Sequence, residues 1–277
     1  MISLFIAMQG ESIMKIGFIG CGNMASAMIG GIIKTKIADC TEIMASDRSE
    51  FMKEKAKEQF GICVTSENTE VAQFADVLVL AVKPFYYEDV ITEIREVVKD
   101  ETIVVSIAPG KKMQWIECLF NKKIKLVRTM PNTPALVGEG MTGICSNPYV
   151  SEAELNQVKD IFCGFGKAEV VSEDLMDAVV GISGSSPAYV FMFIEAMADA
   201  AVADGMPRAQ AYRFAAQAVL GSAKMVLETG KHPGELKDMV CSPKGTTIEA
   251  VRVLEAKGMR SAVIEAQKAC VKKAQEV

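Results

Sequence analysis

A strand that runs through a glycine turn into a helix constrains the fold of this chain more than any other segment. The apolar run KIGFIG (residues 15–20) leads into GCGNMA (20–25) and then into helical periodicity. This is the G-x-G-x-x-G/A pattern in the strand-to-helix context that it requires. Gly20 permits a tight turn, Gly22 lets the backbone approach a pyrophosphate, and Ala25 keeps the helix close to the sheet. The segment therefore predicts a dinucleotide site at a helix N-terminus.

Short apolar runs alternate with helical stretches through the first half of the chain. The predicted strands are KIGFIG, EIMASD, DVLVLAV, TIVVSIA and KLVRTMP, and the helices between them cover residues 23–36, 50–60, 86–99 and 113–120. Continuous Val, Ile and Leu strands separated by helices indicate a parallel sheet covered on both faces, an α/β doubly wound fold. A helix near 151–162 and a short strand, AEVVS (168–172), complete this half.

Only helical periodicity follows. It predicts helices over residues 175–182, 187–204, 207–229, 233–239, 246–256 and 259–276. The two longest are apolar on most sides, so we expect them to be buried, with a partner subunit supplying cover that the few short neighbouring helices lack. We therefore expect a Rossmann-type N-terminal domain over 14–173 and an all-α C-terminal domain over 174–277. The boundary rests on the switch in period alone.

Composition narrows the partners and the compartment. The net charge of −5 is spread along the 277 residues, so no basic stripe marks a nucleic-acid or membrane surface. No apolar run approaches the roughly 18 residues of a membrane span. Eight cysteines without a C-x-x-C pair, and one histidine, His232, spell out neither a metal site nor a disulfide framework, which favours reduced thiols in the cytoplasm. Residues 1–13 lack signal-peptide features, and we expect a disordered extension.

The end of the second strand, Ser46-Asp47-Arg48, bears on cofactor choice. An acidic residue here accepts a hydrogen bond from the ribose 2′-hydroxyl of NAD, whereas an arginine with small hydroxyls suits the 2′-phosphate of NADP. Both signals are present, so the sequence favours NADPH through Ser46 and Arg48 and leaves NADH open through Asp47. For Arg48 an ordinary solvated charge is the alternative.

Three further loops have both a functional and a structural interpretation. Ala81–Pro84 and Met130–Pro134 end strands, where ligands bind in parallel sheets, but their prolines also simply terminate strands or stiffen loops. Gly181–Pro187 interrupts two predicted helices with small residues, as a substrate wall or a tight helix–helix turn.

The segment SPKGTT (242–247) precedes the helix over 246–256. Ser or Thr can cap such a helix, Gly245 allows close approach, and first-turn N–H groups would suit a carboxylate. A capped helix with nothing bound is the alternative. A single histidine leaves little room for a Ser-His-Asp relay, and no general base for an alcohol is evident. A protonated cyclic imine would need none, because it already carries its proton.

The combination of GFIGCGNMA, LAVKP, RTMPNTPALV, GISGSSPAYVF and DMVCSPKGTTIEAVRVLE resembles the Δ1-pyrroline-5-carboxylate reductase family over residues 14–277. The resemblance implies reduction of pyrroline-5-carboxylate to L-proline with NAD(P)H. It also implies that the helical domain forms a homodimer with a second subunit, with higher rings such as a decamer. The alternatives are a hydroxyacid-type dehydrogenase, whose catalytic lysine would be Lys224 or Lys237, and a sensor that binds dinucleotide without turnover.

Site residues are carried over by position. The cofactor contacts implied by the resemblance are Phe18, Ile19, Gly20, Cys21, Gly22, Asn23, Ser46, Arg48, Asn68, Ala81, Val82, Lys83, Pro84, Ile107, Ala108 and Pro109. The implied substrate contacts are Glu173, Met239, Gly245, Thr246 and Thr247. Thr247 would act catalytically through a hydrogen bond to the ring nitrogen. The chain departs from the family pattern at Lys244, where Gly is frequent, at Pro109, where Ala is frequent, and at Met239, where some relatives have Asn.

Overall fold

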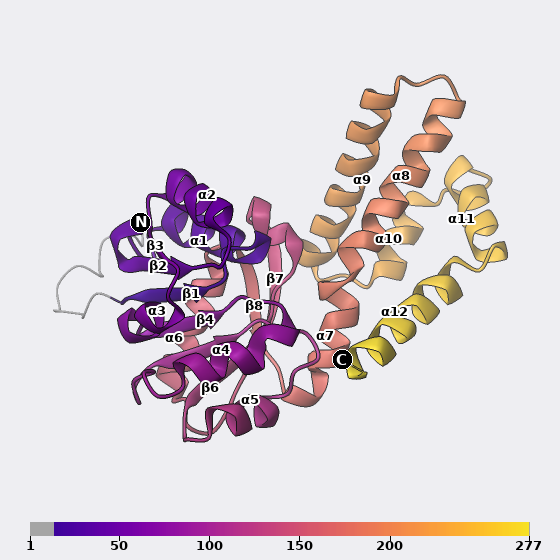
Figure 1. The fold of residues 1–277 in the computed structure, drawn as a ribbon. Helices are drawn as coiled ribbons and strands as arrows, with labels where there is room; N and C mark the ends of the chain where they lie inside the picture. The colour runs from indigo at the N-terminus through magenta and orange to yellow at the C-terminus, as the bar shows by residue number, and fades with distance from the viewer. Residues whose placement is uncertain (1–13, 277) are drawn as a thin grey trace, which may run out of the picture. The chain divides into compact units, whose positions relative to one another are not determined.

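The computed structural model describes residues 14–276 of the chain (Figure 1). They form two compact units, and each is described by itself. The first unit holds the described residues through Gly184 and the end of the chain from Lys273, and the second is Ser185–Lys272. The expected disorder of residues 1–13 lies outside the described residues. The domain boundary between residues 173 and 174 stays a prediction.

One eight-stranded sheet organises the first unit, in the order β3-β2-β1-β4-β5-β6-β7-β8. The strands are β1 (Ile16–Ile19), β2 (Ile43–Ser46), β3 (Cys63–Thr65), β4 (Val77–Leu80), β5 (Ile103–Ser106), β6 (Lys125–Met130), β7 (Gly140–Ser146) and β8 (Gly166–Val170). The first six pair in parallel. Their order, 3-2-1-4-5-6, is that of a dinucleotide-binding Rossmann sheet, so the predicted fold class is confirmed.

Helices connect these strands. They are α1 (Asn23–Thr35), α2 (Glu50–Phe60), α3 (Asn68–Phe74), α4 (Tyr87–Ile94), α5 (Met113–Phe120) and α6 (Glu152–Cys163). The sequence pattern predicted neither β3 nor α3, because three and seven residues are too short for a clear period. The predicted helix over 86–99 ends as α4 at Ile94.

The two faces of the sheet carry separate hydrophobic cores. Alternate residues of each strand point to opposite faces, so Phe18 packs with α1, α2 and α6, while its neighbour Ile19 packs with α3, α4 and α5. Phe18 is fully buried and Ile19 nearly so, and each such side chain contributes about 1.5–3 kcal/mol of transfer free energy. The layers on either side are visible in Figure 1. They hold the carboxyl ends of the strands in fixed positions.

Strand β7 departs from the parallel arrangement, because it pairs antiparallel with β6. The connection between them, residues 131–139, contains only a short 3₁₀ helix, Thr133–Val137. A parallel return needs a crossover of about a dozen residues or more, so this short connection turns the chain back on itself. Strand β8 is again parallel to β7, because α6 supplies a crossover.

The expected loop over 181–187 is helical instead. A short helix, α7 (Met176–Val179), continues into a π-helical turn at Val180–Gly184. A π turn leaves one carbonyl without its usual partner, and the Asn132 amide donates to the carbonyl of Ser183 at 3.0 Å. A Cβ at Gly184 would lie 2.7 Å from Met130 Cε, the far end of a flexible side chain, so packing favours glycine here only weakly. Small residues therefore widen a helix here instead of ending it.

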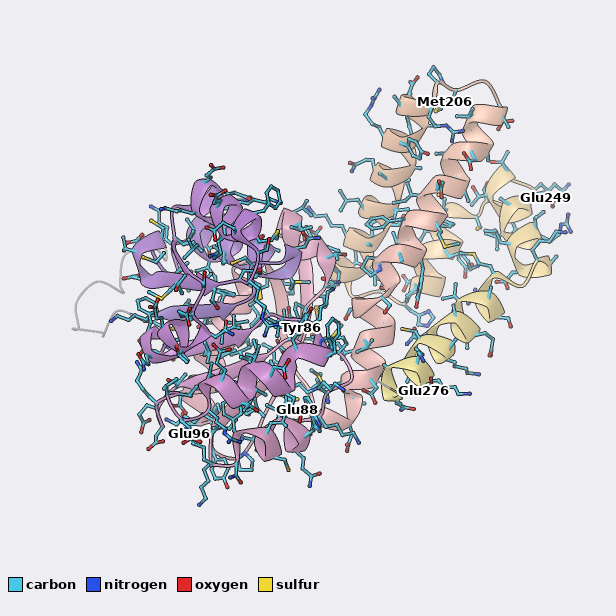
Figure 2. The ribbon with its side chains drawn as sticks, viewed as in Figure 1. Tyr86, Glu88, Glu96, Met206, Glu249 and Glu276 are labelled. Carbon is cyan, nitrogen blue, oxygen red and sulfur yellow. The ribbon has the colours of Figure 1, made fainter. Side chains whose placement is uncertain are left out.

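The second unit is all helical: α8 (Ser186–Ala203), α9 (Arg208–Thr229), α10 (Pro233–Val240), α11 (Thr246–Ala256) and α12 (Met259–Gln275). Helices α8 and α9 form a hairpin whose turn carries Met206 (Figure 2). Alanines provide the close contact, since Ala198, Ala211 and Ala215 are buried. The predicted helices of this half are all present.

Large apolar side chains of this unit are exposed in the single chain, and their expected burial against a partner subunit stays a prediction. Phe191 and Met192 on α8 are 63% and 69% exposed, and Leu227 on α9 is 83% exposed. A surface rich in exposed large apolar side chains is typical of a protein interface or a membrane contact. The few short helices of the unit do not cover it, as the sequence indicated.

One helical segment among residues 14–276, Glu173–Ala203, is long and apolar enough to cross a membrane by length and composition, although we expected no such run. Core and interface helices pass the same test, so this is weak support for a span.

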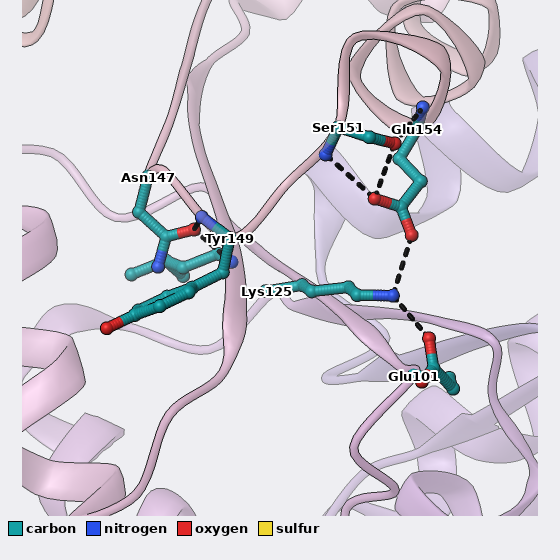
Figure 3. Close-up of polar contacts among 7 residues, drawn as sticks. Glu101, Lys125, Asn147, Tyr149, Ser151 and Glu154 are labelled. Carbon is teal, nitrogen blue, oxygen red and sulfur yellow. Dashed lines mark hydrogen bonds and ion pairs between the residues drawn. The ribbon is translucent and has the colours of Figure 1, made fainter.

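A polar cluster in the first unit holds the first residue of β6, Lys125, in place (Figure 3). The Lys125 ammonium pairs with Glu101 and, at 2.8 Å, with Glu154 Oε1. Glu154 also forms a capping box with Ser151 at the start of α6. Hydrogen bonds to the two carboxylates raise the pKa of Lys125. Burial raises the pKa of Glu154, but hydrogen bonds from Lys125 and Ser151 outweigh it and leave that pKa below 4.5.

Lys125→Met should lower the free energy of unfolding at pH 7 by about 0.5–1.5 kcal/mol, because a partly buried ion pair is lost. Since the folded-state pKa of Glu154 is depressed, its contribution is present above pH 4.5 and is lost as pH falls through the folded value. The difference between variant and parent, measured by urea unfolding, should therefore shrink below pH 4.5. Lys55→Met, at an exposed lysine without an ion pair among the described residues, is the control.

Candidate functional site

The turn after β1 requires glycine at position 20. Gly20 has a left-handed φ of +107°, and a Cβ there would lie 2.8 Å from the carbonyl oxygen of Ala81. Its N–H donates to the carbonyl of Ser46 at 2.7 Å. The turn is thus held between the ends of β2 and β4, the two strands that flank β1. This is the switch point of the sheet, where ligands bind in such folds.

Gly22 is different, because neither backbone nor packing requires a glycine there. Its φ and ψ, −68° and −178°, suit any residue, and a Cβ would have no heavy atom within 4 Å. Gly22 is the N-cap of α1 and has no side chain with which to cap the helix. The first-turn N–H groups of α1 therefore face open space, a cradle that fits an anion.

A cavity of about 860 Å³ in the first unit lies at this point. That volume is within the range of about 300–1,000 Å³ for small-molecule and cofactor sites. Most of the predicted cofactor contacts line it: Ile19, Gly20, Gly22, Asn23, Ser46, Arg48, Asn68, Ala81, Val82, Lys83, Pro84, Ile107 and Pro109. The structure thus brings together residues at or just after the ends of five strands, β1 to β5.

Phe18, Cys21 and Ala108 do not line the cavity, and each is at most 2% exposed. The Cys21 N–H donates to Asp47 Oδ2 at 2.8 Å. Burial and the Asp47 carboxylate raise the pKa of the Cys21 thiol to about 12, so the thiol is protonated at neutral pH. Phe18 and Ala108 belong to the hydrophobic cores on the two faces of the sheet. Direct contact of Phe18, Cys21 or Ala108 with a cofactor stays a prediction.

Internal hydrogen bonds fix the polar side chains at the β2 end of the cavity. The buried Ser46 hydroxyl donates to Asn68 Oδ1 at 2.7 Å, and the Asn68 amide donates to Glu93 at 2.8 Å. The Ser46 proton is therefore already engaged within the protein. The hydroxyl therefore has no proton left to donate to a phosphate. Its oxygen can still accept a hydrogen bond, but only from a phosphate oxygen that is protonated.

Asp47 and Arg48 differ sharply in availability. The two Asp47 oxygens accept the N–H groups of Cys21 and Ser49, both at 2.8 Å. The carboxylate thus stabilises the loop backbone. Arg48 is exposed and forms no ion pair among residues 14–276. Of these two neighbouring charges, the cation is the one that is free to meet an anionic ligand.

The loop after β6 both lines the cavity and has a structural role, the two interpretations that the sequence allowed. Met130, Pro131, Asn132 and Thr133 line the cavity. Asn132 is also a structural anchor, because its Oδ1 accepts from the Met141 N–H at 2.8 Å while its amide caps the π turn. Asn132 therefore fixes one wall of the cavity to the helical segment beyond β8.

Glu173 lies in a partly buried polar cluster. Its Oε1 accepts from the Met113 N–H at 2.7 Å, at the start of α5, and from Arg128 Nη1 at 3.0 Å. Arg128 is 2% exposed and also lies 3.7 Å from Asp177. Glu173 Oε2 makes no hydrogen bond among the described residues. One oxygen is structural and the other is open, which is compatible with the implied substrate contact without testing it.

The loop 241–245 of the second unit begins α11 without a side-chain cap. The N-cap is Gly245, not the Ser or Thr that the sequence allowed. The Gly245 N–H donates to the carbonyl of Ser242 at 3.0 Å, and a Cβ at 245 would lie 2.3 Å from Ser242 Oγ. The N–H groups of Thr246 and Thr247 consequently have no acceptor among the described residues. Here too a helix start offers unpaired donors.

Two other predicted features of the second unit have clear positions. Met239 is 63% exposed near the end of α10. The single histidine, His232, caps α10, and its Nδ1 accepts from the Gly234 N–H at 3.0 Å. It is therefore engaged in a structural hydrogen bond. Within residues 14–276, no group of three or more His, Cys, Asp or Glu side chains is arranged to hold a metal ion.

Sequence reasoning missed several residues that line the cavity. They are Met24, Ser49, Met52, Tyr86 and Val90. Ser49 and Tyr86 follow the ends of β2 and β4, so their position after a strand could have identified them. Val90 carries no local signal, because helix packing alone brings it to the cavity. Gly184, which also lines the cavity, lies in the segment 181–187 for which a substrate wall was one interpretation.

Comparison with known proteins agrees with this geometry. Residues 15–110 match the family "NADP oxidoreductase coenzyme F420-dependent", and residues 173–277 match "Pyrroline-5-carboxylate reductase dimerisation". Fold and cavity together define an oxidoreductase that binds a nicotinamide dinucleotide.

The chain is 54% identical over 263 residues to the pyrroline-5-carboxylate reductase of Escherichia coli, covering 95% of this chain and 98% of that one. The solved pyrroline-5-carboxylate reductase of Coxiella burnetii superposes with a TM-score of 0.88 at 37% identity, covering 96% and 98% of the two chains. The Plasmodium falciparum enzyme, solved with NADP bound, gives 0.88 at 32% identity, covering 96% and 99%. The chain belongs to the pyrroline-5-carboxylate reductase family.

Gly22→Ala tests the cradle directly. The methyl group would enter open space, so the melting temperature should be unchanged, while the affinity for NADP⁺ measured by calorimetry should fall about tenfold or more. Gly20→Ala should instead destabilise the fold, because of its positive φ and its contact with Ala81. Undiminished binding by Gly22→Ala would place the phosphates elsewhere.

Proposed function

We propose that this chain reduces Δ1-pyrroline-5-carboxylate to L-proline with a reduced nicotinamide dinucleotide, the last step of proline synthesis. The observation that carries the proposal is the pair of uncapped helix starts, α1 and α11, in a protein of this family. A dinucleotide provides a pyrophosphate for the first. The substrate provides a carboxylate for the second.

The proposed chemistry requires orientation more than proton transfer. When bound, the reduced nicotinamide supplies a hydride to the imine carbon. The N–H groups of Thr246 and Thr247 hold the substrate carboxylate, and the Thr247 hydroxyl accepts a hydrogen bond from the protonated ring nitrogen. The iminium form already carries its proton, so the chain needs no general base at that atom. The single histidine, His232, accepts a hydrogen bond from the Gly234 N–H at the start of α10, which is a structural role and not a proton-transfer role.

The remaining substrate contacts rest on the family resemblance and on availability. Glu173 would use its open Oε2 toward the amine. Gly245 contributes room and not a donor, since its N–H is bonded to Ser242. Met239 would offer an apolar or backbone contact, and the exposed cation Lys244 would assist the carboxylate.

We propose NADPH as the preferred dinucleotide, with NADH as the weaker one. Two neighbouring side chains support this proposal. Both Asp47 oxygens accept hydrogen bonds from backbone N–H groups, while Arg48 lines the cavity and has no ion-pair partner among the described residues. A free guanidinium binds a 2′-phosphate in a bidentate manner, whereas an engaged carboxylate offers little to a 2′-hydroxyl.

We further propose a homodimer formed through the helical unit, assembled into a higher ring such as a decamer, in the cytoplasm. The match to a dimerisation family and the exposed apolar side chains of α8 and α9 support association. Sedimentation velocity distinguishes a dimer from a decamer, and cell fractionation tests the compartment.

Neither rival function has an observation in its favour. Lys224 and Lys237 form ion pairs with Glu228 and Asp238 on the surface of the single chain, so neither is poised as a catalytic lysine. A sensor that binds dinucleotide without turnover would use the same cavity, so an activity assay separates it from the enzyme.

The purified chain should consume NADPH with pyrroline-5-carboxylate and form proline in equal amount. Loss of NADPH absorbance and amino-acid analysis measure the two. Consumption with keto acids but not with pyrroline-5-carboxylate would favour the hydroxyacid class. Binding of NADPH without consumption would favour the sensor.

Thr247→Ala should lower kcat/KM for pyrroline-5-carboxylate roughly fivefold to 150-fold. This corresponds to a loss of about 1–3 kcal/mol of transition-state stabilisation, because the hydrogen bond of the hydroxyl strengthens in the transition state. Thr246→Ala is the matched control, because its proposed contribution is a backbone N–H that alanine retains. Equal effects of the two variants, or none at Thr247, would exclude the proposed role of the Thr247 hydroxyl.

A further inference from the structure

The aromatic ring of Tyr86 lies against the side chain of Arg48, the residue in the loop after β2 that is free to meet an anionic ligand. The guanidinium carbon of Arg48 lies 5.3 Å from the ring centroid of Tyr86. The ring is itself packed against Phe85, with centroids 4.3 Å apart and an interplanar angle of 50°. Tyr86 lies at the N-cap of α4 (Figure 2). The Phe85–Tyr86 contact therefore orients the surface on which Arg48 rests.

Arg48 and Tyr86 come from loops that follow different strands. Arg48 follows β2, Tyr86 follows β4, and both line the 860 Å³ cavity. Strands β2 and β4 flank β1 on opposite sides, so the contact spans the glycine turn. Phe85 does not line the cavity.

Arg48 would otherwise be mobile. It is exposed, and no carboxylate among the described residues pairs with it, because its neighbour Asp47 is turned to backbone N–H groups. A free arginine loses rotamer freedom when it binds an anion, and this loss weakens binding. A guanidinium that already lies on an aromatic face has lost part of that freedom beforehand.

We propose that Tyr86 is a specificity-determining positioning residue, which holds the Arg48 guanidinium at the cavity so that it meets the 2′-phosphate of NADP. This rests on the proposed use of NADPH through Arg48. Tyr86 acts through Arg48 and not on the parts that NADP and NAD share. Its ring face is what matters, and its hydroxyl is dispensable.

The experiment is calorimetric titration of the full-length protein with NADP⁺ and with NAD⁺. Arg48→Gln should weaken NADP⁺ binding and leave NAD⁺ binding unchanged. Tyr86→Leu should lower the ratio of NADP⁺ to NAD⁺ affinity about threefold to tenfold, as expected from loss of a cation–π contact. Tyr86→Phe keeps the ring and should keep the ratio. In the Arg48→Gln background, Tyr86→Leu should have no further effect on the ratio.

Tyr149→Leu is the matched control. Lys123 lies 5.7 Å from the Tyr149 ring in the same unit, and Tyr149 does not line this cavity. Its removal should leave both affinities unchanged. Melting temperatures confirm that each variant folds.

Three outcomes would overturn or redirect the account. Equal weakening of NADP⁺ and NAD⁺ by Tyr86→Leu would mean that Tyr86 contacts the shared part of the cofactor and would reject the positioning role. A Tyr86→Phe variant that behaves like Tyr86→Leu would reject the role of the ring face. An unchanged affinity ratio in Arg48→Gln would instead contradict the proposed cofactor preference, which separates failure of that proposal from failure of this inference.

Discussion

Backbone N–H groups without acceptors at the start of α1 are the constraint around which the first unit is built. A helix cannot satisfy its first donors itself, and Gly22 has no side chain to do so. The two hydrophobic cores on either side of the sheet fix β1, β2 and β4 so that their carboxyl ends surround these donors. The 860 Å³ cavity is the space that results. An anionic ligand completes an arrangement that the protein leaves open.

The same constraint recurs at α11, and this recurrence shapes the chemistry that we infer. Gly245 again caps a helix without a side chain, and Thr246 and Thr247 present free N–H groups. A protein with two such helix starts and a histidine engaged in capping is suited to holding two anions, and less suited to moving protons through side chains. Reduction of a protonated imine carboxylate with a dinucleotide needs that combination and little more.

Local patterns predicted what is local in this structure. The strand–turn–helix at residues 15–25 and the helices of the second half have periods long enough to recognise. Strand β3 and α3 are too short for that, and the antiparallel β7 follows from a connection length, not from composition. Non-local pairs left no trace in the sequence. The Glu173–Arg128 ion pair joins residues 45 positions apart, and the Arg48–Tyr86 contact depends on β2 and β4 flanking β1. The pattern of α8 reports apolarity and not what covers it, so its predicted burial against a partner subunit stays a prediction.

A crystal structure of the chain with NADP⁺ and L-proline tests the central claim most directly. The account predicts the proline carboxylate within hydrogen-bond distance of the Thr246 and Thr247 amides, its ring nitrogen beside the Thr247 hydroxyl, and the dinucleotide phosphates at Gly22. Proline bound away from the start of α11, with those two amides facing solvent, would contradict it.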